Sequence, residues 1–101
     1  MKIEIVEFYP YKTEEGFQIH KGTLHVYLID WQLDLRGIRV EKLESQWRFY
    51  LPVLFALDHE TQQKVKYPII SFTDREKHRN FVSMIREIGK DYIMQNFKEL
   101  L

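Results

Sequence analysis

The sequence predicts an α+β fold, in which an antiparallel sheet of about five strands is followed by one long C-terminal helix packed on the sheet. Three observations support this. Stretches of alternating apolar and polar residues, separated by turn-forming residues, extend through residue 72. The remaining residues show the apolar spacing of an amphipathic helix. With 101 residues, 45% of them hydrophobic, the chain is expected to form a single domain, residues 1–101.

The first three strands follow from a period of two in hydrophobicity. We expect them at residues 2–11, 22–30 and 33–42, with a turn at 13–16 between the first two. In the third strand the apolar residues occupy odd positions up to Leu35 and even positions from Ile38 onward. A β-bulge at Gly37 would explain this change of phase, because glycine accepts the backbone conformation of a bulge.

The fourth strand is unusually apolar. It lies within the stretch RVEKLESQWRFYLPVLFA, and we expect it to run from Trp47 to Leu54. A polar loop at 57–64 leads to a fifth strand at 65–72. Pro68 cannot donate a ladder hydrogen bond, so this strand should lie at an edge or end at that point.

The helix has a recognisable start. Thr73 stands three residues before Glu76, which is the spacing of a capping box. On a helical wheel one apolar arc should face the sheet. It consists of Phe81, Met84, Ile85, Ile88 and Tyr92.

Composition argues against several classes of function. The chain has no cysteine, which excludes a disulfide framework and a zinc–thiolate site. It has no long apolar stretch, so we expect no membrane partner and a cytoplasmic location. The four histidines are scattered without metal-ligand spacing, and the four glycines form no phosphate loop. We therefore expect neither an enzyme, nor a bound metal, nor another cofactor.

The order of motifs resembles the SpoVG family, the stage V sporulation or septation regulators. The similarity covers about residues 22–93. Its motifs are Gly37-Ile38-Arg39-Val40, the strand from Phe49 to Pro52, Tyr67-Pro68-Ile69, and the helix after Ser71 and Thr73. The resemblance implies a small α+β homodimer that binds DNA or RNA.

The sequence departs from the family pattern at three places. The family strand that ends in proline leads into a basic pair, whereas Val53 and Leu54 follow Pro52 here. The family histidine before the second proline is Tyr67, and the aspartate of the Asp-Ile-Lys-Val motif is Gly37. The formal net charge of zero likewise gives nucleic-acid binding no support from composition.

Basic residues of the helix form a candidate phosphate-binding stripe. Its members, within about 60° of one another on the wheel, are Arg75, Arg79, Arg86 and Lys90. Secondary candidates are Arg36, Arg39, Lys64 and Lys66. The alternative is an ordinary solvated helix face, flanked by Glu76, Glu87 and Asp91.

Apolar residues suggest a contact between subunits. Ile93 and Phe97 fall on the same stripe as the helix cations, and large exposed apolar groups usually have a partner. The expected dimer contact comprises Phe49, Leu51, Val53, Ile93 and Phe97. The fourth strand also carries three aromatic residues, Trp47, Phe49 and Tyr50. They either pack in the core or in the dimer contact, or they stack on the bases of a single-stranded nucleic acid.

Two functions follow from the sequence. In the first, the protein is a dimeric nucleic-acid-binding regulator of the SpoVG type. In the second, the same fold acts through protein contacts alone. The basic stripe and the resemblance favour the first, while the neutral charge and the missing basic pair favour the second.

Overall fold

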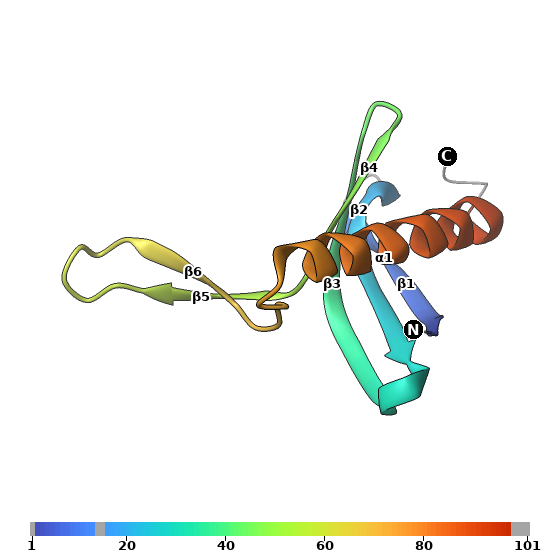
Figure 1. The fold of residues 1–101 in the computed structure, drawn as a ribbon. Helices are drawn as coiled ribbons and strands as arrows, with labels where there is room; N and C mark the ends of the chain where they lie inside the picture. The colour runs from blue at the N-terminus through green and yellow to red at the C-terminus, as the bar shows by residue number, and fades with distance from the viewer. Residues whose placement is uncertain (1, 14–15, 98–101) are drawn as a thin grey trace.

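The computed structural model describes residues 2–13 and 16–97, and it confirms the α+β fold with a C-terminal helix packed on an antiparallel sheet (Figure 1). The described residues form β1 (Ile3–Thr13), β2 (Gly16–Leu28), a short 3-10 helix (Ile29–Trp31), β3 (Leu33–Leu43), β4 (Gln46–Tyr50), β5 (Val53–Leu57), β6 (Lys64–Pro68) and α1 (Arg75–Asn96).

The first four strands form one antiparallel sheet in the order β1-β2-β3-β4. The predicted bulge at Gly37 is confirmed, since Leu24 pairs with Ile38 and Val26 with Leu35, leaving two residues of β3 opposite one of β2. Gly37 has φ +78°, which glycine adopts without strain. The predicted turn at 13–16 includes residues 14 and 15, which lie outside the described residues.

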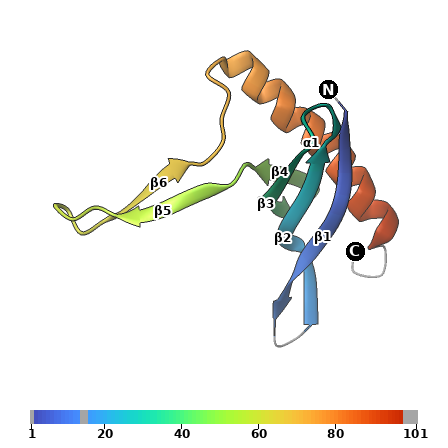
Figure 2. The ribbon, with the colours of Figure 1, turned by 90° about the horizontal axis from the view of Figure 1, so that it is seen from below.

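The expected fifth strand does not join this sheet. The apolar stretch divides at Leu51 and Pro52 into β4, which ends the large sheet, and β5, which pairs only with β6 in a second, two-stranded sheet. Pro52 has no N–H to continue a ladder, and its carbonyl oxygen instead accepts a hydrogen bond from the N–H of Ile69 (3.2 Å). The β5–β6 hairpin, residues 53–68, projects from the body and is called the arm below (Figures 1 and 2). β6 ends at Pro68, which is one of the two expected alternatives, so residues 69–72 of the expected strand lie outside it.

Helix α1 lies across one face of the four-stranded sheet (Figure 2). The core between them contains Phe8, Leu24, Val26, Leu28, Leu35, Ile38, Val40, Trp47, Phe49, Phe81, Ile85 and Ile93. Strand residues of this core alternate with outward-facing ones, so β1 to β4 bury one face and leave the other open.

The buried line of α1 differs from the expected arc. The buried helix residues, Phe81, Ile85, Gly89 and Ile93, are spaced by four. Each step of four residues turns about 40° around the helix, so the buried line drifts along its length. Met84, expected against the sheet, is instead exposed. Ile93, expected on the outward stripe, is fully buried.

Asp74, rather than Thr73, is the N-cap of α1. Its carboxylate accepts hydrogen bonds from the N–H groups of Glu76 (2.9 Å) and Lys77 (3.2 Å). The capping signal in the sequence therefore located the helix start to within one residue.

Candidate nucleic-acid interface

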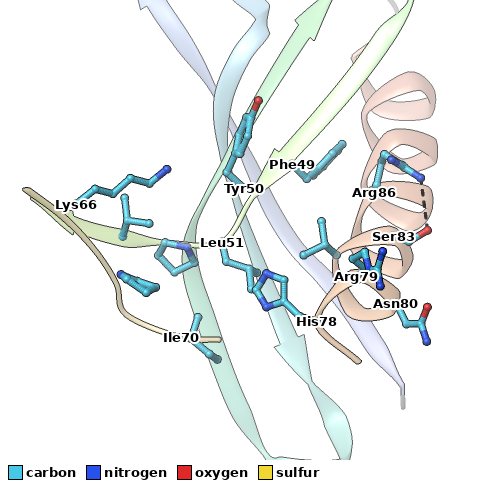
Figure 3. A pocket seen from close by; sticks show the side chains of 14 residues that line it. Phe49, Tyr50, Leu51, Lys66, Ile70, His78, Arg79, Asn80, Ser83 and Arg86 are labelled. Carbon is cyan, nitrogen blue, oxygen red and sulfur yellow. Dashed lines mark hydrogen bonds between the residues drawn. The ribbon is translucent and has the colours of Figure 1, made fainter. Parts of the chain in front are cut away.

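A groove of about 790 Å³ separates the base of the arm from the first half of α1 (Figure 3). We call it the arm–helix groove. Apolar side chains from three segments line it. They include Leu51 and Val53 from residues 50–53, which link β4 to the arm, Ile70 after β6, and Val82 from the helix. The groove exists because the chain leaves the large sheet at Pro52, forms the arm, and returns through residues 69–74 to begin α1. The start of α1 forms the wall of the groove that faces the base of the arm.

Cations stand on both sides of this groove. Lys66 extends from the arm, while Arg79 and Arg86 extend from the helix (Figure 3). Arg86 donates a long hydrogen bond to the hydroxyl of Ser83 (3.4 Å) and lies 4.0 Å from the Glu87 carboxylate. Such exposed contacts are weak, so the guanidinium is available to an incoming anion.

A second hollow, of about 450 Å³, lies on the sheet side of the link at residues 50–53. We call it the sheet-side hollow. Arg36, Arg39 and Lys66 line it, and Lys66 also lines the arm–helix groove. The Arg39 guanidinium sits over the ring of Tyr50, 4.8 Å from its centroid, and 3.7 Å from the Glu41 carboxylate.

The charged side chains that line the two hollows are all basic. Together they include five Lys and Arg side chains, which are Arg36, Arg39, Lys66, Arg79 and Arg86. Among the described residues no Asp or Glu lines either hollow, although the whole chain has 15 acidic and 15 basic residues. Cations gathered in concave sites raise the local concentration of anions.

The fold brings together part of the predicted set. Arg79 and Arg86 remain together, and three of the four secondary candidates join them around the link. Arg75 lies beside Arg79 in a separate hollow with Ser71 and Phe72. Lys64 and Lys90 line neither the arm–helix groove nor the sheet-side hollow.

Sequence reasoning missed three polar helix residues of the groove: His78, Asn80 and Ser83. Ser83 stands four residues after Arg79 and three before Arg86, and this spacing does place it on the same side of the helix. No such signal marked His78. Its Nδ1 accepts a hydrogen bond from the N–H of Phe72 (3.4 Å), which ties the helix to the segment that follows β6.

The expected dimer contact requires correction. Phe49 and Ile93 belong to the protomer's own core, where they are 5% and 0% exposed. Phe97 packs edge-on against Phe8, with ring centroids 5.2 Å apart. Leu51 and Val53 are half-buried in the groove walls. A cluster of exposed apolar side chains lies instead on and beside the arm, where Leu54, Phe55, Leu57, Tyr67 and Ile69 are each more than half exposed.

The described part of the chain contains no group of three or more metal-ligating side chains. Within the same ranges, 2–13 and 16–97, no helix has both the length and the apolar character needed to cross a membrane.

Comparison of the chain with protein-family models, with curated proteins and with solved structures finds no match.

Proposed function

We propose that this protein is a small dimeric nucleic-acid-binding regulator, resembling SpoVG, that contacts phosphates through the cations around the arm. One observation carries the proposal. The arm–helix groove and the sheet-side hollow together have five cationic side chains and no carboxylate in their described linings. An even mixture of charges would be expected from a chain with equal numbers of acids and bases.

The arrangement suits a phosphate backbone. Lys66 stands at the junction of both hollows, so a strand could pass from Arg79 and Arg86 to Arg36 and Arg39 without leaving basic surface. Phosphate contacts require only charge and donors, and they release condensed counterions. Affinity should therefore fall steeply with salt.

The test is titration of labelled single- and double-stranded oligonucleotides at about 50 mM and about 200 mM salt. For duplex DNA, three phosphate contacts would reduce the affinity about 40-fold over this range. The double variant Arg79→Glu/Arg86→Glu should bind more weakly, and its salt slope should be smaller by about 2.

The matched control is Lys2→Glu/Lys77→Glu. It makes the same change of net charge at exposed residues that line neither hollow. It should lose much less affinity than the groove variant. Absence of binding by the unaltered protein at low salt, or equal losses in both variants, contradicts the proposal.

The exposed apolar arm favours a second candidate, a protein-interaction module that binds no nucleic acid. A two-stranded hairpin is only marginally stable alone, and the arm leaves most of its large apolar side chains in water. Both candidates include a homodimer. They differ in the outcome of the oligonucleotide titration.

A further inference from the structure

The uncovered face of the four-stranded sheet carries one row of side chains that crosses every strand. Tyr9 of β1 pairs with Thr23 of β2, Thr23 with Arg39 of β3, and Arg39 with Tyr50 of β4. We call these four residues the transverse row. Their neighbours Phe8, Leu24, Val40 and Phe49 are buried, so the alternation of each strand directs the row away from α1.

Two aromatic residues on this face are exposed without a packing role in the described core. Tyr9 is 53% exposed and Tyr11, two residues further along β1, is 56% exposed. At the other end of the row Tyr50 is half-buried beneath the guanidinium of Arg39. A ring stacked against a cation on a strand is held in place, which reduces the entropy lost when a further planar group binds.

Hollows lie on both sides of Arg39. One, of about 560 Å³, is lined by Tyr9, Tyr11, Thr23 and Arg39 together with Glu41. The other is the sheet-side hollow, which contains Arg39 and Tyr50 and continues to Lys66 at the arm. The transverse row therefore joins an aromatic end to the basic surface already described.

We propose that the transverse row, with Tyr11, is a stacking platform for unpaired bases of single-stranded nucleic acid. This rests on the proposed function and specifies its ligand. Three strand spacings separate Tyr9 from Tyr50, about 14 Å, which is enough for bases to stack at both ends. Arg39 lies between the two tyrosines, where its guanidinium can bind a phosphate or stack on a base. Every base offers a planar face, so stacking does not depend on sequence.

The proposal distinguishes single strands from duplexes. Bases inside a duplex are stacked on one another and cannot reach a sheet surface, whereas phosphates are accessible in both forms. Loss of the tyrosine rings should therefore weaken single-strand binding selectively. Loss of the groove cations should weaken both.

The experiment compares oligo(dT), oligo(U) and a DNA duplex as ligands of the full chain. Tyr9→Ala and Tyr50→Ala should each lower the affinity for the single strands about 5- to 150-fold, because a stacked base is worth about 1–3 kcal/mol. Duplex affinity should change less than about twofold. Tyr9→Phe and Tyr50→Phe keep the ring and should retain binding. The two single strands show whether the platform prefers DNA or RNA.

Tyr67→Ala is the matched control. Tyr67 has nearly the same exposure as Tyr9, 51%, but it lies on the arm outside the transverse row. Thermal unfolding of each variant verifies that it is folded. Single-strand binding that is unchanged by Tyr9→Ala and Tyr50→Ala, or reduced equally by Tyr67→Ala, overturns the platform while the proposed function stands. No binding of any oligonucleotide at low salt overturns both.

Discussion

Gly89 sets how closely α1 approaches the sheet. A Cβ at this position would lie 2.7 Å from the Cε1 atom of Phe49 and 3.1 Å from Leu24 Cδ2. Gly89→Ala has two opposing effects, since alanine favours the helix by about 1 kcal/mol while overpacking costs about 1–3 kcal/mol. Both contacts are with core side chains, so we expect a net loss of stability.

Chemical denaturation measures this change in the free energy of unfolding. Gln95→Ala, at an exposed position of the same helix, serves as the control and should change stability little. A stabilisation by Gly89→Ala of about 1 kcal/mol, as helix propensity alone would give, would show that the helix sits further from the sheet.

Tyr92 predicts a pH dependence. Partial burial, and secondarily the Glu7 carboxylate, raise the pKa of Tyr92 above the ordinary value of 10.0. The folded state therefore favours the protonated phenol, and this contribution to stability is present below about pH 10 and lost as the pH rises through the folded pKa. Tyr92→Phe cannot ionise.

Urea unfolding from about pH 8 to about pH 11 should show the wild type losing more stability than Tyr92→Phe in the alkaline part of the range. Parallel losses in the two proteins would mean that Tyr92 ionises equally easily in the folded and unfolded states.

Ile93 shows why residue-level placement on the helix was partly wrong. A wheel with one fixed apolar arc assumes that the same side faces the sheet along the whole helix. A helix that packs through residues four apart moves its buried side by about 40° at each step. Over the three steps from Phe81 to Ile93 the buried line reaches the angle of Arg75, about 40° from that of Arg79. That crossing geometry is set by the sheet and is not encoded in the helix alone.

At the scale of the element, the start of α1 gives a direct test. Asp74 caps two N–H groups, whereas Thr73 makes no described capping contact. Asp74→Ala should therefore lower the free energy of unfolding by about 1 kcal/mol, while Thr73→Ala should have little effect. Denaturation of both variants distinguishes them. A larger loss in the threonine variant would place the cap where the capping-box pattern put it.

The arm is the element that sequence reasoning described least well. The sequence predicted one strand from Trp47 to Leu54 where the structure has β4 and a separate β5, and it predicted β6 as a longer strand at 65–72. Ending at Pro68 was one of the two alternatives expected for that strand. Nothing local showed that Pro52 would direct β5 out of the large sheet, because a proline is also compatible with an edge strand. The grouping of Lys66 with Arg79 and Arg86 depends on that departure. The basic residues could therefore be named from the sequence, but their two hollows could not.

At the scale of the whole molecule, the two edges of the arm differ. β6 carries Lys64, Lys66 and Pro68, which are features that discourage edge-to-edge pairing. β5 has the sequence VLFAL, without a charge or a proline, and its outer edge is unpaired in the described structure. An exposed apolar edge of this kind is a template for another strand.

A second copy fits this edge, because an antiparallel strand is complementary to itself across a two-fold axis. Pairing β5 with its counterpart would give a four-stranded sheet in the order β6-β5-β5-β6. It would place no lysines opposite one another at the junction. The same pairing through β6 would bring the lysines of two chains together. We therefore expect the proposed dimer to form through β5.

Sedimentation over a range of concentrations tests this arrangement with Leu54→Lys, at an exposed position on β5. Each dimer would gain two lysines at the junction and lose two leucine contacts, so the dissociation constant should rise at least about tenfold. Leu43→Lys, with similar exposure at the end of β3, is the matched control and should leave the dimer intact. A wild-type protein that sediments as a monomer throughout, or equal dissociation of both variants, would exclude β5 pairing. Because Leu54 lines neither basic hollow, the Leu54→Lys monomer would also show whether one protomer suffices for nucleic-acid binding.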